Sequence, residues 1–250
     1  MVELAALHAY CDRLLDIERF DDYCPNGLQV ETTARVGRLV TGVTACQALI
    51  DAAVDWKADA ILVHHGYFWR GEEPCLLGIK GRRIASLIRN DLSLLAYHLP
   101  LDAHRGLGNN AQLARVLDIA QAEPTDAGTG LVWRGRLETV LPASALAERI
   151  ATALGRAPVH LPGGPRGIET LAWCSGAAQG FLEQAATLPV DAYISGEVSE
   201  QTTHQARELG VHYFAAGHHA TERYGVSALG EHLAEQFTLE HRFIDIPNPI

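Results

Sequence analysis

The sequence predicts an α/β protein made of two similar three-layer α/β lobes with mainly parallel sheets. Short apolar runs typical of buried strands alternate with amphipathic segments typical of helices along the chain. The same order of strand, glycine, helix, Asp-Ala, strand and polar residues also occurs twice, in TGVTACQALIDAA…ADAILVHHG and in CSGAAQGFLEQAA…VDAYISGEVSE. Such alternation is typical of parallel sheets that are covered by helices on both faces.

In the first half, an amphipathic helix within residues 1–20 precedes a Pro-Asn-Gly turn signal at 25–27. We predict strands at 38–45, 59–66 and 92–102, and helices at 46–58, 82–91 and 109–119. The last helix opens with two asparagines that can cap it. Pro100 argues against a helix in the segment 98–102.

The polar stretch 121–130 has the composition of a boundary between lobes. Beyond it, a second alternation predicts strands at 133–141, 169–176, 190–197 and 211–222 and helices at 144–154, 177–188 and 199–210, with a Pro/Gly-rich connector at 156–167. A last helix (226–237) and strand (239–247) can complete the first lobe. We therefore expect a discontinuous first lobe of residues 1–124 and 213–250, and a second lobe of residues 125–212.

The balance of charge argues against an extended nucleic-acid surface. The chain carries 30 acidic residues against 20 lysines and arginines, for a formal net charge of -10, whereas phosphate binding needs a clustered basic face. The one basic cluster, Lys80 to Arg83 with Arg89, fits a solvated helix face or a local contact to a phosphate.

Cysteine usage and the first residues indicate an intracellular protein. The five cysteines are scattered and never spaced as Cys-x-x-Cys, which argues against a disulfide framework or a zinc ribbon and favours a reducing compartment. The start of the chain has no basic signal region. No stretch approaches the roughly 18 apolar residues of a membrane span, so we expect a cytoplasmic protein without membrane contact.

Potential metal ligands follow three predicted strands. His64 and His65 follow the first, His98 and Asp102 the second, and a third set consists of His218, His219 and Glu222. Because sites in parallel sheets lie beyond the carboxyl ends of the strands, these groups are expected to converge. Imidazole with carboxylate suits zinc, manganese or iron. Three such clusters exceed the needs of one ion, so two ions sharing a carboxylate fit better.

Each piece alone has a simpler explanation. One histidine of an adjacent pair in a strand can be a packing residue, and His218 with Glu222 can be a surface pair on a helix. Glu197 and Glu200 suit the first turn of a helix, where acids meet the helix dipole. The segment GLGNN (106–110) fits a turn with a cap, or a phosphate contact at a helix start. His104 and His219 are candidates for supporting or proton-transfer roles.

Six segments together resemble the GTP cyclohydrolase 1 type 2 homologues, also called Nif-three-like proteins, and in particular their bacterial YbgI type. These segments are DDYCPNGLQVE, TGVTACQALIDAA, ADAILVHHGYFW, YHLPLDAHRGLGNNAQLA, DAYISGEVSEQTTH and AAGHHATERYGV. The resemblance implies a dinuclear metal site with ligands His64, His65, Asp102, His218 and Glu222. It also implies a ring-shaped homohexamer. Many members have His-His-Pro where this chain has His65-Gly66, and longer members carry an inserted domain that is absent here.

Two functions are consistent with these features. The first is a hydrolase that depends on two divalent metal ions and acts on a nucleotide or related heterocycle, with a link to damaged nucleotides implied by the resemblance. His98, close to Asp102 in sequence, is then the candidate proton-transfer residue. The alternative is a non-catalytic hexamer that binds metal or a partner. A catalytic site keeps an open coordination position, whereas protein ligands close a structural one.

Overall fold

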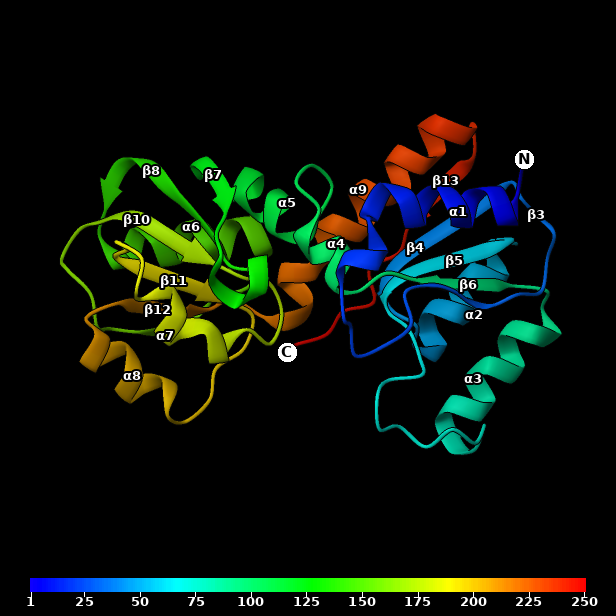
Figure 1. The fold of residues 1–250 in the computed structure, drawn as a ribbon, viewed down its shortest axis with the longest axis horizontal. Coiled ribbons are helices and arrows are strands. Elements are labelled where there is room, and N and C mark those ends of the chain that lie inside the picture. The colour runs from blue at the N-terminus through cyan, green and yellow to red at the C-terminus, as the bar shows by residue number, and fades with distance from the viewer. The chain divides into compact units, whose positions relative to one another are not determined.

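The computed structural model describes all 250 residues and divides them into two compact units. Unit 1 comprises Met1–Leu101 and Val226–Pro247, and unit 2 comprises Asp102–Gly225 and Asn248–Ile250. Each unit contains a sheet with helices on both faces (Figure 1), which confirms the α/β fold class. The boundaries differ from the expected ones, because α5 (Asn109–Val116) and β12 (His212–Ala215) belong to unit 2.

The main sheet of unit 1 has the strand order β13-β4-β5-β6-β2. Its four parallel strands are β4 (Arg38–Thr44), β5 (Ala60–His65), β6 (Ser93–Ala96) and β13 (Glu240–Phe243), and β2 (Gly27–Val30) pairs antiparallel with β6. A small ladder joins β1 (Val2–Glu3) to β3 (Arg35–Val36). The strands predicted at 38–45 and 59–66 are confirmed, whereas the strand predicted at 92–102 ends at Ala96, and β1, β2 and β3 were not predicted.

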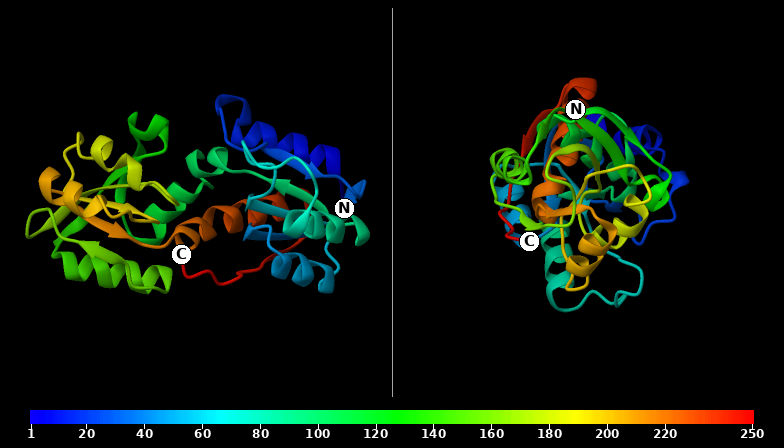
Figure 2. Two further views of the ribbon diagram at one scale, coloured as in Figure 1. Left: turned by 90° about the horizontal axis from the view of Figure 1, so that it is seen from below. Right: turned by 90° about the vertical axis from the view of Figure 1, so that its left-hand side faces the viewer.

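Helices cover both faces of the unit 1 sheet. The helix α1 (Leu4–Leu15) buries Leu4, Leu7, Cys11 and Leu15, which recur with helical spacing. Figures 1 and 2 show α1 and α2 (Gln47–Asp55) on opposite faces of the sheet, with α3 (Gly78–Arg89) on the α2 side. The α2 side is packed by alternate strand residues such as Val40, Ile61 and Leu94.

The sheet of unit 2 has the order β7-β8-β10-β11-β12-β9. Its centre is parallel and its edges are antiparallel, so it is a mixed sheet. The strands are β7 (Ala120–Pro124), β8 (Trp133–Leu141), β9 (Val159–Leu161), β10 (Ile168–Trp173), β11 (Ala192–Ser195) and β12. The edge strands β7 and β9 were not predicted, because each is short and lies in a segment rich in loop residues.

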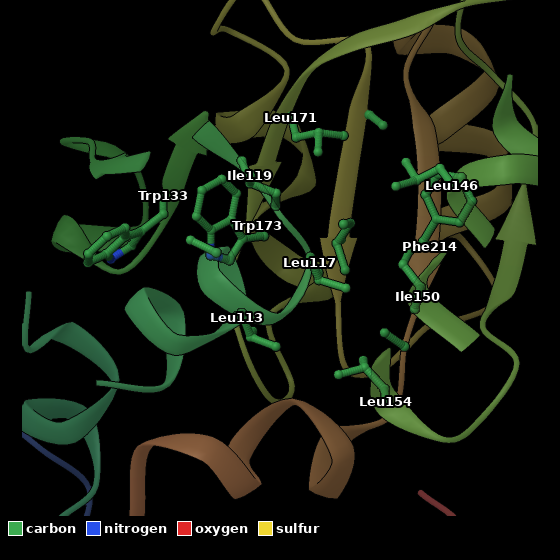
Figure 3. Close-up of a cluster of buried hydrophobic side chains, with 14 of the residues drawn as sticks. Leu113, Leu117, Ile119, Trp133, Leu146, Ile150, Leu154, Leu171, Trp173 and Phe214 are labelled. Atoms are coloured by element: carbon green, nitrogen blue, oxygen red, sulfur yellow. The ribbon is translucent and has the colours of Figure 1, made fainter. Parts of the chain in front are cut away.

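A single apolar cluster fills one face of the unit 2 sheet. Figure 3 shows Trp173 and Phe214 of the sheet together with Leu113 of α5 and Ile150 of α6 (Ala143–Leu154). The remaining helices are α7 (Leu182–Ala185), preceded by a 3-10 turn at Gln179–Phe181, and α8 (Thr202–Leu209). The predicted helix at 177–188 is therefore shorter and irregular at its start.

Two predictions about the segments beside the strand ends need correction. Residues Leu99–Ala103 form a short helix, α4, although Pro100 was expected to exclude one. Proline is tolerated there because it lies in the first turn, where its missing N–H has no partner in the helix. Residues 218–222 belong to α9 (His218–Phe237) rather than to a strand. Its residues up to Gly225 are part of unit 2, and those from Val226 are part of unit 1.

The repeated Asp-Ala motif has the same structural role in both units. In unit 1, Oδ2 of Asp59 accepts hydrogen bonds from the backbone N–H groups of Gly37 and Arg38, at 2.7 and 2.8 Å. In unit 2, Oδ2 of Asp191 accepts the N–H groups of Glu169 and Thr170, both at 2.9 Å. Each aspartate thus ties the start of one parallel strand to the start of the next.

The helices of the chain include none that combines the length and the apolar character required to cross a membrane.

Replacing Asp191 by alanine is expected to lower the free energy of unfolding by about 1–3 kcal/mol at pH 7, since hydrogen bonds to a charged acceptor are lost. Burial alone would raise the pKa of Asp191, but the N–H groups of Thr170 and Glu169 outweigh it and hold the pKa below its usual value. The ionised form is therefore stabilised by folding. Its contribution is present above the unfolded pKa of about 4 and is lost as the pH falls through the lower folded pKa.

Urea denaturation between pH 7 and pH 2.5 measures this effect. The difference in the free energy of unfolding between wild type and Asp191→Ala should become smaller as the pH falls. Glu138→Ala, which removes an exposed carboxylate from β8 of the same sheet, is the matched control and should change stability little. A pH-independent difference would contradict the assignment.

Candidate functional site

In unit 1, β5 ends in the two adjacent histidines. His64 is completely buried, and its Nδ1 lies 2.9 Å from the backbone carbonyl oxygen of Tyr97. A carbonyl only accepts, so Nδ1 carries the proton and Nε2 carries the lone pair. His65 is half-buried, with Nδ1 at 3.2 Å from Oγ1 of Thr44. Contacts at Nδ1 thus orient both rings, as is usual for histidines that bind metal through Nε2.

His98 lies beside this pair, just beyond the end of β6. Its ring centroid is 5.0 Å from that of His64 and 5.7 Å from that of His65. Each of the three histidines offers a ligand nitrogen, and these nitrogens lie within 4.8 Å of one another. The structure therefore brings His98 together with the predicted ligand pair, at a distance suited to a ligand or to a proton-transfer group.

Asp22 fixes the position of His98 and was not identified from the sequence. Its Oδ1 accepts a hydrogen bond from Nδ1 of His98 at 2.7 Å, and its Oδ2 accepts from the backbone N–H of Leu99 at 2.9 Å. Burial opposes ionisation of Asp22, but these hydrogen bonds, with one from Asn26, lower its pKa below the usual value. An ionised partner on Nδ1 leaves Nε2 of His98 as the atom that can exchange a proton.

In unit 2, Asp102 is a buried carboxylate with dedicated donors. Its side chain lies on α4 and is 6% exposed. Its Oδ1 accepts hydrogen bonds from Nδ2 of Asn109 at 2.9 Å and from Oγ of Ser175 at 2.8 Å. Ser175 follows β10, so the carboxylate is held at the carboxyl end of this strand.

The asparagines at the start of α5 hold this arrangement rather than capping the helix. The residue that caps α5 is Gly108, and no side chain hydrogen-bonds the first turn from that position. Oδ1 of Asn110 accepts the backbone N–H of Ser175 at 2.9 Å, while Asn109 accepts the N–H of Gly225 at 3.0 Å. The turn-and-cap interpretation of the segment 106–110 is therefore wrong in its second half.

His218 and Glu222 occupy successive turns at the start of α9, on one face of the helix. Nε2 of His218 lies 3.1 Å from Oε2 of Glu222. Two ligands bound at about 2.1 Å to one ion lie roughly 3 Å apart, so this separation fits a shared divalent cation. Burial lowers the pKa of His218, but the carboxylates of Glu222 and Glu197 outweigh it and raise the pKa to about 9. The pair is an environment that favours positive charge.

Glu197 supports His218 instead of meeting a helix dipole. Its Oε1 accepts from Nδ1 of His218 at 2.7 Å, which corrects the interpretation suggested by the sequence. Glu200 is exposed and lies 3.8 Å from His204. Nδ1 of His104 accepts backbone N–H groups of the 106–107 turn, and the backbone N–H of His219 bonds to the carbonyl of Ile250.

Two glycines let α9 begin directly against the strand ends of unit 2. A Cβ atom on Gly196 would lie 2.7 Å from Cα of His218, and one on Gly176 would lie 2.2 Å from Oε1 of Glu222. Gly176 also has a φ of +66°, and its N–H donates to Oγ1 of Thr221 at 3.0 Å. The absence of side chains at 176 and 196 is therefore a requirement for the position of Glu222 and His218.

The donor set of each unit suits divalent cations of the zinc, manganese and iron group. Unit 1 supplies imidazoles, and unit 2 supplies carboxylates with one imidazole. Cys174, buried close to Asp102 and Glu222, has a pKa well above its usual value because of its burial and of both carboxylates, so it is a neutral thiol. The assignment of all five ligands to one dinuclear centre, and the role of His98, remain predictions.

Comparison with known proteins gives a consistent result. The model of the Duf34/NIF3 (NGG1p interacting factor 3) family matches residues 2–249. A protein of Allochromatium vinosum named GTP cyclohydrolase 1 type 2 homolog is 57% identical over 249 residues, covering 100% of this chain and 98% of that protein. A protein of the same name from Pseudomonas aeruginosa is 54% identical over 250 residues and covers 99% of each chain.

Solved structures agree over the whole length. A protein described as ybgI, of unknown function, has a TM-score of 0.95 at 49% identity, with full coverage of both chains. The protein TTHA1606 of Thermus thermophilus has a TM-score of 0.91 at 33% identity, again with full coverage of both. The resemblance deduced from the sequence motifs is thereby confirmed.

Replacing Gly176 by alanine is expected to displace the Glu222 carboxylate and to reduce the bound metal. The change also costs about 1–2 kcal/mol because the backbone has a positive φ. Gly155→Ala is the matched control, since Gly155 has a φ of +71° and no atom within 4 Å of an added Cβ. Gly155→Ala should lose only the stability that the positive φ costs and should keep its metal, whereas Gly176→Ala should lose more stability, because its Cβ overlaps the Glu222 carboxylate, and should lose metal by elemental analysis. Equal metal content in the two variants would contradict this expectation.

Proposed function

The chain belongs to the Duf34/NIF3 family, and from this membership we propose that it is a hydrolase which uses two divalent metal ions to act on a nucleotide or a related heterocycle. The five proposed ligands are His64, His65, Asp102, His218 and Glu222. The name shared by the relatives, GTP cyclohydrolase 1 type 2 homolog, supports a heterocyclic nucleotide as the substrate class.

The observation that supports this function best is that, within each unit, neighbouring groups hold the proposed ligands in orientations suited to binding a metal ion. Nδ1 of His64 donates to a backbone carbonyl, so the lone pair of the ring lies on Nε2, the atom that would bind a cation. Glu222 is 3% exposed beside His218. A buried carboxylate is stabilised by nearby positive charge, which a divalent cation would supply in addition to His218.

Two divalent ions held by these residues would supply a water-derived nucleophile near neutral pH and would stabilise developing negative charge. The protein residues contribute orientation and proton transfer. Ser175 and Asn109 hold Oδ1 of Asp102 and so fix the direction of this carboxylate. His98, held through Nδ1 by ionised Asp22, presents Nε2 as the atom that accepts or delivers a proton.

Purified protein is expected to carry close to two divalent ions per chain, measured by elemental analysis. His64→Ala and Glu222→Ala should each lose at least one ion. Hydrolysis of a nucleotide or phosphate ester should stop on chelation and return with manganese, zinc or iron, and Asp102→Ala should abolish it. The rate should rise with pH through the pKa of the activated water, about 7 in a well-activated site.

His241→Ala is a suitable control because this histidine bonds to Thr41 within unit 1 and is not a proposed ligand. It should retain full metal content. Full metal content in both ligand variants would contradict the site. If a broad panel of nucleotides is not hydrolysed with any of the metals, the non-catalytic metal-binding or partner-binding protein becomes the better description.

Replacing His98 by alanine is expected to slow turnover by about 10²-fold or more while metal content stays intact, because a general acid or base is lost. Asp22→Asn should shift the pH profile without removing the imidazole, since it replaces the ionised partner of Nδ1. Loss of metal in His98→Ala would instead make His98 a ligand, an outcome that its distance to His64 and His65 also permits.

We also propose that the chain assembles into a homohexamer. An exposed apolar patch at the start of α3 supports this assembly: Leu76, Leu77 and Ile79 are 51%, 71% and 60% exposed. Contiguous exposed apolar side chains of this size commonly mark protein interfaces. The basic residues of α3 lie next to this patch in a chain of net charge -10, so a second copy offers charge complementarity.

Light scattering on dilute wild-type protein should give a mass near six times 27.1 kDa. Leu77→Glu should shift the population to smaller species, because a charge buried in an interface is costly. Val140→Glu, at an exposed apolar residue of unit 2 outside the patch, serves as the control and should remain assembled. A monomeric wild type would rule out the hexamer.

A further inference from the structure

The loop of residues 66–77 that follows His65 is fixed in an unusual conformation. Gly66 leaves the strand against Gln29, whose side-chain amide is bonded to both the N–H and the C=O of Tyr67, at 2.8 and 3.1 Å. Tyr67 is buried, with its hydroxyl donating to the carbonyl of Ala45 at 2.6 Å. Tyr67 is therefore the core residue of this loop.

The two residues after Tyr67, Phe68 and Trp69, are not buried in the core. Phe68 has a φ of +66°, which is rare for a bulky side chain and costs about 1–3 kcal/mol. One carboxylate oxygen of Glu72 accepts the N–H groups of both Phe68 and Trp69, at 3.0 and 3.2 Å. The strained turn is thus held firmly and fixes the backbone of Trp69, although Trp69 is only half-buried.

Arg70 connects this loop to residues 21–23, which include Asp22, the partner of His98. The N–H of Arg70 bonds to the carbonyl of Tyr23 at 2.5 Å, and its guanidinium bonds to Asp21 at 2.7 Å and to the carbonyl of Asp22 at 2.9 Å. Trp69 and Tyr23 are therefore positioned together with Asp22, the partner of His98. Lys80 is engaged with Glu72 in the same loop, which leaves its sequence-based phosphate role without support.

Two partly exposed aromatic rings consequently adjoin the histidines. The Trp69 ring centroid lies 5.0 Å from that of His98, with the planes at 86°, and 6.0 Å from that of His65. The ring of Tyr23, which is 52% exposed, lies 5.8 Å from that of His98. Flat aromatic surfaces beside a hydrolytic site are suited to planar heterocycles, since every nucleobase has a face that stacks.

We propose that Trp69, assisted by Tyr23, is the surface against which the planar base of the substrate stacks. This inference rests on the proposed function, in which the substrate is a heterocyclic nucleotide. It assigns a substrate-binding role to residues outside the metal ligands: the base is held by the unit 1 loop, and the loop is kept rigid by Gln29, Glu72 and Arg70. Stacking of this kind contributes affinity without discriminating strongly between bases.

Binding of guanosine 5′-monophosphate and of ribose 5-phosphate to the full-length, metal-loaded protein tests the proposal without requiring turnover. Trp69→Ala is expected to weaken binding of guanosine 5′-monophosphate by about tenfold or more and to leave binding of ribose 5-phosphate, which lacks a base, unchanged. Trp69→Phe should retain most of the affinity. Trp56→Phe is the matched control, because Trp56 lies in unit 1 against Arg38 and Arg242.

Intrinsic fluorescence provides a second readout. Guanosine 5′-monophosphate should quench the emission of wild type and of Trp56→Phe, and Trp69→Phe should lose this quenching, since Trp133 and Trp173 are buried in the core of unit 2. Equal loss of both ligands in Trp69→Ala, or a wild type that prefers ribose 5-phosphate or binds neither, would overturn the stacking role. Base-dependent binding without hydrolysis would instead preserve it and contradict only the catalytic function.

Discussion

Asp102 is buried, with only 6% of the residue exposed. Burying a charged carboxylate costs several kcal/mol unless hydrogen bonds or opposite charge compensate it. Oγ of Ser175 and Nδ2 of Asn109 supply two of the compensating hydrogen bonds. Asn110 holds Ser175 in place, and Asn109 in turn receives the N–H of Gly225 on α9. The end of β10, the start of α5 and the α9 segment in unit 2 are therefore arranged around one anionic group.

Gly176 and Gly196 also contribute to the arrangement of charged groups, because neither carries a side chain. Oε1 of Glu222 and the backbone of His218 occupy the space that side chains at 176 and 196 would need. Thr221, between these two residues of α9, bonds the N–H of Gly176. The side chains of His218 and Glu222 are thus brought close together by backbone contacts at Gly176 and Gly196. A change in the conformation of the loop at Gly176 is therefore expected to change the position of Glu222.

The sequence was sufficient for features that are encoded locally. Apolar runs that end in His64-His65 predicted the buried strand β5, whereas residues 218–222 were predicted to continue a strand and instead begin α9. The residues that position His98 and Asp102 were missed, because Asp22 is 76 positions from His98 and Ser175 is 73 positions from Asp102. Such pairings depend on the tertiary fold. α4 was missed for a local reason, since proline is excluded from helix interiors but not from the first turn.

Asp59, just before β5, and its counterpart Asp191, just before β11, also bear on the order in which the chain folds. Asp59 bonds to Gly37 across 22 positions and Asp191 to Glu169 across the same separation, whereas the ion pair between Arg38 of β4 and Glu240 of β13 spans 202. Closing a short loop costs less chain entropy than closing a long one. The β4-α2-β5 and β10-α7-β11 segments are thus the favoured nuclei, and β13 joins its sheet only after the intervening residues have been synthesised. During that interval the edge of β4 lacks its β13 partner, and an unpaired strand edge can pair with other chains.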